Sequence, residues 1–530
     1  MKKKLVFAYF LLFLAVFFAV GDLFAQKNKK TRSGEAHNCA SLQNDTVYNT
    51  CITVSPEILK ILQDTRTAQY VANNRITIQN YPIATQKALT YLENHGFPFA
   101  SVYLDSIAEK NDTVFANLMI DKNIHCTFDS IVNRGNLKIA KKYLKAYLNF
   151  NRKKFYNESI VKQIPKLIQE IPFASQTQSS AVEFTEQKAA LYIFLDKKRV
   201  NQFDGYIGLV PVSDRSGKIA ISGELNLHLM NLFTIGENID LQWRATERYS
   251  QYLDIKVNFP YLFGTPLGVD GLLTLDKKDT TYLNMNYVIG LNYSFRGYNF
   301  VRAYFDYATS NILDKKLYEN SNFLSYSDYR KSMYGFAFRF RNLDFIYNPR
   351  KGYDINLNFA VGTQKIIKNH NADTHFYDNL DLLTIRYRLH GKIKGYIPLH
   401  KRWVMVLGAE GGGIFGKQNL VNEMFRIGGM NSLQGFDDLS IRASSYGIAL
   451  WELRFLMAKI AYINTFFNAA WYEQKIKNNY AHDFPFGFGI GLTFTTKAGL
   501  FYLSYALGKQ LDNPISFKTG KIHFGLAVQF

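Results

Sequence analysis

The stretch LTIRYRLHGKIKGYI, residues 383–397, alternates apolar and polar side chains along most of its length. Its apolar set is Leu383, Ile385, Tyr387, Leu389, Ile393 and Ile397, and its polar set is Thr384, Arg386, Arg388, His390, Lys392 and Lys394. A period of two residues is typical of a β-strand with one apolar face. Several cationic side chains share the polar face, which a packed core does not bury but a water-filled lumen accommodates. The stretch therefore indicates a strand of a transmembrane β-barrel.

The same alternation continues from about residue 203 to the C-terminus. It is clear in YLDIKVNF (252–259), in GYDINLNFAVG (352–362) and in the final residues 522–530. A soluble β-sandwich also alternates, but these segments run to ten or more residues and often begin or end with Tyr, Phe or Trp, as an interfacial aromatic girdle does. At roughly 20 residues per strand and connection, residues 203–530 predict a transmembrane β-barrel of about 16 antiparallel strands.

The N-terminus predicts export. Met1 is followed by three lysines, an apolar run and Ala25, which match a secretory signal peptide over residues 1–25. An N-terminal membrane anchor is the alternative, although the run is short for a membrane span. The chain has 530 residues, a net charge of +20 and 15% aromatic residues.

Residues 26–200 have a mixed pattern. We expect a linker over 26–65 with room for one short helix, capped by Ser55 and begun by Pro56. A partial or divergent α+β unit is predicted over 66–123. Residues 124–200 predict a small α+β domain in the order β-α-α-β-β, with Asn157 capping its second helix.

Nothing in the chain predicts catalysis or a cofactor. Cys39, Cys51 and Cys126 lack metal-ligand spacing, and a disulfide between the first two remains open. The glycines of 411–416 spell G-x-G-x-x-G, but no helical pattern follows as a dinucleotide site requires. The positive charge is spread over many strands, which argues against a nucleic-acid partner and fits a cationic lumen or contact with outer-membrane lipid.

Several motifs, in this order, resemble the BamA/TamA superfamily of outer-membrane proteins, whose periplasmic units are POTRA domains. The motifs are NPRKGYDINLNFAVG (348–362), FRIGGMNSLQGF (425–436), WELRF (451–455), FFNAA (466–470), GFGIGLTF (487–494) and HFGLAVQF (523–530). The resemblance covers most of the chain after the signal peptide. It implies that the region predicted over 124–200 is a POTRA-like domain, with a divergent one before it.

The resemblance also implies a set of site residues, none of them catalytic. A loop that folds back into the barrel contributes Phe425, Arg426, Gly428, Gly429, Gln434, Gly435 and Phe436; the barrel wall contributes Phe466 and Asn468; the following strand contributes Glu452 and Arg454; a C-terminal assembly signal contributes Phe524 and Phe530.

The chain departs from the family at the loop tip. There the family pairs an arginine of the loop with an aspartate of the wall, and the matching residues here are Gln434 and Asn468. Two neutral amides avoid a stranded charge in the lumen, and we expect them to form an amide-to-amide hydrogen bond. The alternative is a loop that has lost its anchor.

By resemblance, the chain is expected to assemble or insert outer-membrane proteins, with its N-terminal part in the periplasm of a Gram-negative bacterium. The clients would be unfolded outer-membrane or secreted polypeptides, bound along the strand edge of KAALYIFLD (188–196) or of its neighbour and passed to the seam of the barrel. The expectation leaves room for periplasmic accessory proteins. The alternatives are a secretion pore for one dedicated exoprotein, with the helix from Ser55 as its plug, and a passive porin or scaffold.

Overall fold

A computed structural model describes most of the chain. It describes residues 49–527 apart from 66–68, 70, 111–112, 151–153, 212–218, 246–249, 298, 314–326, 346–347, 369–376, 378–380, 418, 431, 477–478, 497–498 and 512–514. The predicted signal peptide, Cys39, whose pairing with Cys51 the sequence left open, and Phe530 lie outside these residues. None of the helices in the described part of the chain is both long and apolar enough to cross a bilayer.

The chain divides into two compact units, and the described part of the first covers 49–88 and 102–120. Its elements are β1 (Asn49–Val54), α2 (Pro56–Asp64), β2 (Arg75–Ile76), the first part of α3 (Tyr81–Asn94), β3 (Ser101–Lys110) and β4 (Thr113–Asp121). The sheet order is β2-β1-β4-β3. Ser55 caps α2, because its hydroxyl accepts a hydrogen bond from the Ile58 amide at 3.4 Å.

The predicted linker boundary at residue 65 falls inside this first unit. Strand β1 pairs with both β2 and β4, and α2 buries Ile58 and Leu62 in the same core as Leu118. Residues 49–64 therefore belong to the fold that we expected to begin at 66. A pattern of one short strand and one short helix does not reveal its sheet partner 60 residues later.

The second unit begins with an α+β domain, which we call the docking domain. It consists of β5 (Thr127–Asn133), α4 (Lys141–Tyr147), α5 (Glu158–Gln169), β6 (Ala174–Thr185) and β7 (Lys188–Lys197), in the predicted order. Asn157 caps α5 through its side-chain oxygen, which accepts from the Ile160 amide at 3.0 Å. The fully buried side chains Leu144, Ile164 and Leu191 form part of its core.

The strand order of the docking domain decides between the two strand edges that we expected, that of 188–196 and that of its neighbour. The sheet runs β5-β7-β6, so β7 lies in the centre, parallel to β5 and antiparallel to β6. Residues 188–196 therefore have neighbours on both sides, and the expected edge falls on a neighbouring strand rather than on 188–196. Its two neighbours, β5 and β6, form the edges of the sheet, because β7, the last strand along the chain, inserts between them.

The barrel follows. Its strands are β8 (Gln202–Pro211), β9 (Ile219–Met230), β10 (Asn238–Ala245), β11 (Gln251–Phe259), β12 (Leu267–Lys278), β13 (Tyr282–Arg296), β14 (Asn299–Ile312), β15 (Tyr329–Leu343), β16 (Gly352–Ile366), β17 (Leu383–Pro398), β18 (Trp403–Phe415), β21 (Ser445–Leu456), β22 (Tyr462–Ile476), β23 (Asn479–Asp483), β24 (Phe486–Thr496), β25 (Gly499–Lys509) and β26 (Lys521–Ala527). Strands β23 and β24 both pair with β22, as two halves of one interrupted strand. The barrel closes where β26 meets β8, which confirms a transmembrane β-barrel of about 16 strands.

Side-chain exposure in the barrel follows the predicted alternation. Leu383 and Ile385 are 66% and 58% exposed on the outer surface, whereas Arg386 between Ile385 and Tyr387 is 1% exposed on the inner side. Strand β15 shows the same outward row with Tyr334, Phe336, Phe338 and Phe340. The outer surface is apolar and the inner surface carries the charge.

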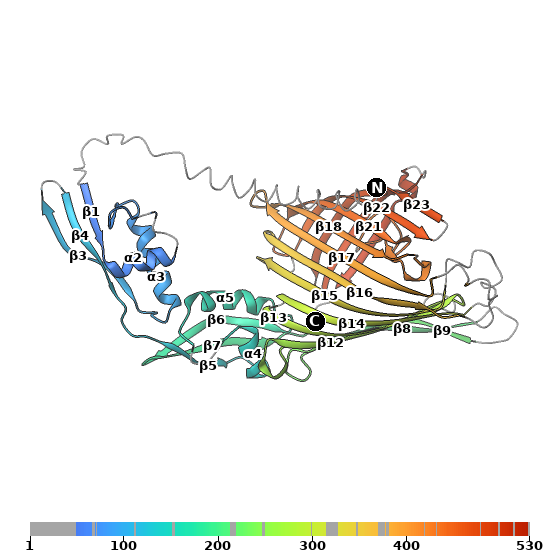
Figure 1. Ribbon diagram of the computed structural model, residues 1–530, viewed down its shortest axis with the longest axis horizontal. Helices are drawn as coiled ribbons and strands as arrows, with labels where there is room; N and C mark the ends of the chain where they lie inside the picture. The colour runs from blue at the N-terminus through green and yellow to red at the C-terminus, as the bar shows by residue number, and fades with distance from the viewer. Residues whose placement is uncertain are drawn as a thin grey trace. The chain divides into compact units, whose positions relative to one another are not determined.

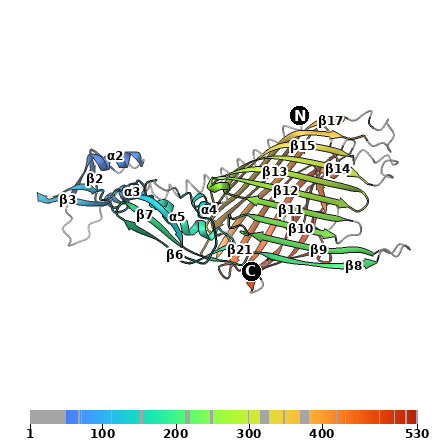
Figure 2. The same cartoon turned by 90° about the horizontal axis from the view of Figure 1, so that it is seen from below.

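The docking domain lies at one end of the barrel, beside the turns that join β9 to β10, β11 to β12 and β13 to β14 (Figures 1 and 2). The turn between β11 and β12 contains a short 3-10 helix, η2 (Leu262–Gly264).

The assignment of faces predicts the effect of an added charge. Phe336→Arg places a cation at the middle of β15 on the outer surface. It should destabilise the folded barrel in vesicles, lowering its free energy of unfolding by about 2–4 kcal/mol. Gln242→Arg is the control, because Gln242 faces inward, directly opposite Asp254. Folding into phosphatidylcholine vesicles over a urea series measures both, and equal losses would show that the faces are wrongly assigned.

Candidate functional site

The connection between β18 and β21 folds into the barrel, and we call residues 416–444 the lumen loop. It contains a short 3-10 helix, η6 (Val421–Glu423), and a small hairpin of β19 (Phe425–Ile427) and β20 (Ile441–Ala443). Inside the barrel, the Arg426 guanidinium contacts the Tyr282 hydroxyl at 3.4 Å, and the Phe425 ring contacts the Tyr446 ring edge-on at 5.4 Å. The predicted entry of this loop into the lumen is present in the structure.

The loop tip meets the wall at the two residues that replace the family ion pair. Asn468 Nδ2 donates to the main-chain oxygen of Gln434 at 3.3 Å and to the main-chain oxygen of Gly487 at 3.1 Å. The Gln434 side chain instead accepts from the Tyr502 hydroxyl at 3.3 Å and donates to the Met430 carbonyl at 3.4 Å. Gln434 and Asn468 therefore meet, but the expected amide-to-amide bond is wrong in its acceptor.

Glycine in the wall is what allows this main-chain contact. Asn468, Gly487 and Gly508 lie side by side across β22, β24 and β25. A Cβ atom on Gly487 would lie 2.1 Å from the Gln434 oxygen, and one on Gly508 would lie 2.6 Å from the Gly435 oxygen. The tip thus rests on a notch of bare backbone, which we call the glycine seat (Gly487 and Gly508).

The loop itself needs glycine at three predicted positions. Gly428, Gly429 and Gly435 have φ angles of 119°, 84° and 99°, which side-chain-bearing residues rarely adopt. A Cβ on Gly435 would also lie 2.8 Å from the Leu507 oxygen. The Phe436 ring beside them is 7% exposed and shares an apolar cluster with Leu433.

The tip reaches further along the wall, to the last strand of the barrel. The Gly435 amide donates to His523 Nε2 at 3.3 Å, and Asp437 pairs with Lys521 at 2.7 Å. Met430 lies close to Gly525 of the same strand. The lumen loop therefore spans the wall from β22 to β26, which is the strand that closes the barrel against β8.

Beneath the tip lies a charged cavity of 220 Å³. Arg454 and Glu452 form a bidentate pair in its wall, with N–O distances of 2.9 and 3.0 Å, and the Arg454 guanidinium lies over the Tyr462 ring. Phe466 and Asn468 also line this cavity. Glu452 and Arg454 neutralise each other along one strand, and no described hydrogen bond or ion pair joins them to the lumen loop.

Sequence reasoning missed the ion pair that does hold the loop. Arg386 of β17 contacts Glu423 of the loop at 2.6 Å, and the two side chains are 2% and 0% exposed. Arg386 also donates to Gln364 and to Asn419 Oδ1, while Glu423 accepts from the Leu420 amide at 2.9 Å. The loop here carries the anion and the wall the cation, the reverse of the arrangement that the resemblance implies. The excess of cations on the inner face of β17 could have indicated that one of them pairs with an anion elsewhere. It did not indicate which residue that anion is.

A second set of contacts joins the docking domain to the barrel. Three turn glycines with positive φ meet its helices: Gly236 approaches the Tyr143 ring, Gly264 approaches Lys142, and Gly297 approaches Glu170 and Leu167. A Cβ atom at any of them would lie within 3 Å of the helix residue. The helices can lie this close because the turns present backbone alone.

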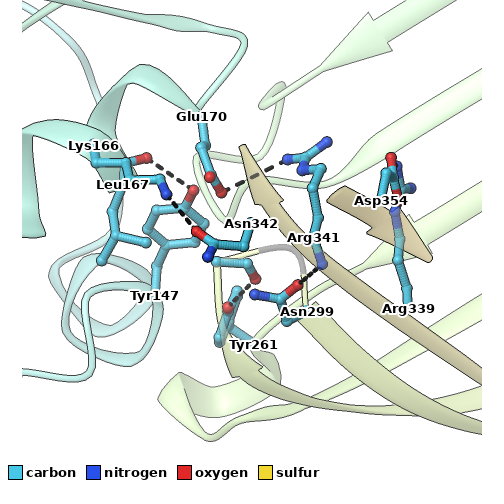
Figure 3. Close-up of polar contacts among 11 residues, drawn as sticks. Tyr147, Lys166, Leu167, Glu170, Tyr261, Asn299, Arg339, Arg341, Asn342 and Asp354 are labelled. Atoms are coloured by element: carbon cyan, nitrogen blue, oxygen red, sulfur yellow. Dashed lines mark hydrogen bonds and ion pairs between the residues drawn. The ribbon is translucent and has the colours of Figure 1, made fainter. Parts of the chain in front are cut away.

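Polar contacts of Tyr147 and Tyr261 lie at the junction as well (Figure 3). The Tyr261 hydroxyl donates to the Gly297 oxygen at 2.7 Å, and the Tyr147 hydroxyl donates to the Leu167 oxygen at 3.0 Å. Burial raises the pKa of the Tyr261 hydroxyl, so this group stays protonated and remains a donor. The junction is a packed interface in which both buried tyrosine hydroxyls have hydrogen-bond acceptors.

Strand β15 carries one arginine for the junction and one for the barrel (Figure 3). Arg341 pairs with Glu170 of the docking domain at 3.6 Å, and both side chains are about 10% exposed. Two residues earlier, Arg339 pairs with Asp354 of β16 at 3.3 Å. Lys166 of α5 adds a hydrogen bond to Asn342 at 2.8 Å.

Phe524 of the predicted assembly signal lies on the outer surface and is 62% exposed. It contacts Phe501 of β25 at 6.0 Å between ring centroids. The described residues contain no group of three or more His, Cys, Asp or Glu side chains placed to hold a metal ion.

Comparison with known proteins places these features in context. The model of the Omp85 superfamily domain matches residues 231–530. The structure of CdiB from Escherichia coli is 14% identical with a TM-score of 0.55, covering 96% of this chain and 97% of that one. CdiB from Acinetobacter baumannii is 13% identical with a TM-score of 0.53, covering 97% of each chain.

The structure of BamA from Haemophilus ducreyi lacking POTRA domains 1-3 is 15% identical with a TM-score of 0.46, covering 90% of this chain and 98% of that one. No curated protein sequence matches the chain. At these identities, the two CdiB structures show a likeness of fold alone.

The glycine seat predicts that one methyl group displaces the tip. Gly487→Ala should favour the unseated tip by about 1–3 kcal/mol, because its Cβ would collide with the Gln434 oxygen. In a background with the native cysteines replaced by alanine, Gln434→Cys should then react with a membrane-impermeant maleimide roughly ten-fold faster. Gly447→Ala is the control, since its Cβ would meet nothing within 4 Å. Equal labelling rates in the two variants would contradict the seat.

The buried pair predicts strong coupling. Glu423→Gln or Arg386→Gln alone should cost about 3–5 kcal/mol of unfolding free energy, because each leaves a buried partner unmatched. The double variant should cost much less than the sum of the two. The control pair is Lys417 with Asp381, 3.0 Å apart and exposed, for which we expect less than about 1 kcal/mol. Denaturant titrations of the four-member cycle measure this, and additive losses would refute the clamp.

Proposed function

Because the chain belongs to the Omp85 superfamily, we propose that it assembles polypeptide clients into the outer membrane of a Gram-negative bacterium. The docking domain and the first unit lie in the periplasm in this proposal, where unfolded clients arrive. The chain contributes binding and templating, and the proposal assigns it no catalytic step and no cofactor.

The observation that carries the proposal is a free strand edge in a domain whose helices pack against the barrel turns. Within the described residues, β6 is one of the two outer strands of the docking-domain sheet, with β7 on its other side and β5 at the opposite edge. Such an edge offers backbone N–H and C=O groups to an extended client. The junction with the barrel turns then keeps that client near the barrel mouth. A passive porin or scaffold needs neither feature.

The barrel wall offers the second step. Strands β26 and β8 close the barrel, and the lumen loop contacts β26 through the Gly435 amide and Asp437. We propose that a client strand pairs at this closure when it opens, so that its backbone groups are never exposed to lipid. The seated loop stabilises the closed wall until then.

A secretion pore for one dedicated exoprotein is the second candidate, but a segment other than the helix from Ser55 would have to plug it. Helix α2 was the expected plug, and its apolar residues Ile58 and Leu62 are instead fully buried in the core of the first unit. Withdrawing the helix would expose that core. Accessory periplasmic proteins are compatible with either function.

Controlled depletion of the protein, followed by quantification of the outer-membrane proteome, tests the proposal. A broad fall in unrelated barrel proteins is the expected result. Loss of one or two surface or secreted proteins alone would favour a dedicated exporter, and an unchanged proteome would reject the handling of clients.

The junction predicts a difference between two neighbouring arginines. Arg341→Ala leaves Glu170 buried without its ion-pair partner and should weaken docking by about 3 kcal/mol. Amide hydrogen exchange in α4 and α5 of the full-length protein should therefore quicken, and client assembly should fall. Arg339→Ala, which breaks only the pair with Asp354 inside the barrel, should change neither. Equal effects of the two variants would show that the junction is not what couples the domains.

A further inference from the structure

Two cations lie opposite each other on the outer surface of the barrel. Arg330 of β15 is paired in register with Lys365 of β16, and both side chains are exposed. By strand alternation Arg330 shares the outward face with Phe336, and Lys365 shares it with Phe359. Like charges directly opposite each other in a sheet are destabilising, so this pair needs a counter-anion.

The neighbouring outward residues do not supply that anion. In the same row, Thr309 lies opposite Arg330 on β14 and Leu383 lies opposite Lys365 on β17. The next row contains Ser332 opposite Thr363. None of these described neighbours carries negative charge, and three of them bring hydroxyl groups.

The two carboxylates nearby in sequence have other partners. Asp328 accepts a hydrogen bond from the Ile312 amide at 2.5 Å, and Asp381 pairs with Lys417 at 3.0 Å. Among the described residues, therefore, no carboxylate pairs with Arg330 or Lys365, and the two cations are open to an anion from outside the chain.

The position of the pair along the strand says where that anion comes from. Arg330 lies eleven residues before Arg341, which contacts the docking domain, so it sits about 36 Å away at the opposite end of the barrel. Tyr334, four residues after Arg330 on the same outward face of β15, is 66% exposed and belongs to the apolar surface. The pair thus lies just beyond the hydrocarbon core, at the depth of lipid headgroups.

We propose that Arg330 and Lys365 form a binding site for the phosphate groups of a glycolipid in the outer leaflet. The leaflet assignment rests on the proposed function, which puts the docking domain in the periplasm. The two side chains neutralise the phosphate, and the hydroxyls of Thr309, Ser332 and Thr363 are available as hydrogen-bond donors around it. The exposed Leu383 and Ile385 provide apolar surface for the acyl chains of the same lipid.

Lipid binding to the purified full-length protein tests the site. The protein is reconstituted in phosphatidylcholine nanodiscs that contain bis-phosphorylated lipid A, and the retained lipid is measured by native mass spectrometry. Arg330→Gln and Lys365→Gln should each weaken retention about five-fold, and together about 25-fold. The charge-preserving variant Arg330→Lys with Lys365→Arg should retain the lipid, which excludes misfolding as the cause.

The matched control is Lys277→Gln. Lys277 faces outward on β12 by the same alternation, but it lies opposite Leu283 and Gln251 rather than a second cation. It should change retention little. An equal loss in Lys277→Gln would overturn the site, because general surface charge would then explain the binding.

Three further probes separate the sources of the anion. Dephosphorylated lipid A should bind the natural chain as weakly as the double variant, and equal retention of both lipid A forms would overturn the role of phosphate. Stronger retention of phosphatidylglycerol than of lipid A, or full displacement by equimolar inorganic phosphate, would overturn the glycolipid assignment. Because no client takes part, the outcome is independent of the depletion experiment.

Discussion

The constraint on which the structure depends is that backbone polar groups inside a membrane must be satisfied within the protein. Closing β26 against β8 meets it for the wall, and the lumen loop must then meet it against an already paired sheet. Gln434 accepts a hydrogen bond from Asn468, and the Gly435 amide uses His523. Only bare backbone lets the chain lie this close, which is why Gly487 and Gly508 stand opposite the tip.

The two ends of the lumen loop differ in how strongly they are held, because only the base has a buried ion pair. At its base, Arg386 and Glu423 form a fully buried pair with further hydrogen bonds, and breaking such a pair is strongly destabilising. At its tip, hydrogen bonds of 3.3 Å between neutral groups hold Gln434, and the ion pair of Asp437 with Lys521 is exposed, so each contact contributes only about 1 kcal/mol or less. The base is therefore the fixed end, and the tip, which touches β26, is the end that can leave its site.

Sequence patterns predicted the strands and helix starts, which depend on neighbouring residues. They missed the strand order and the contact partners, which depend on residues far apart in the chain. Alternation in 383–397 indicated a barrel strand, and Asn157 indicated a helix start, because both are properties of neighbouring residues. The central place of β7 depends on parallel pairing with β5, about 60 residues earlier, and alternation does not encode it. The partner of Arg386 lies 37 residues away in a loop. The acceptor for Asn468 is a main-chain oxygen, which every residue has, so the sequence does not identify it.

The central claim is that polypeptide clients pass from the β6 edge to the closure between β26 and β8. Site-specific photo-crosslinking in living cells tests it most directly, with a crosslinking amino acid in place of Val182 on β6 and, separately, of Ile522 on β26. The account predicts that both positions capture newly made outer-membrane polypeptides, and that a position remote from both, Tyr287 on β13, captures none. Capture at neither position, or equal capture at Tyr287, would contradict it.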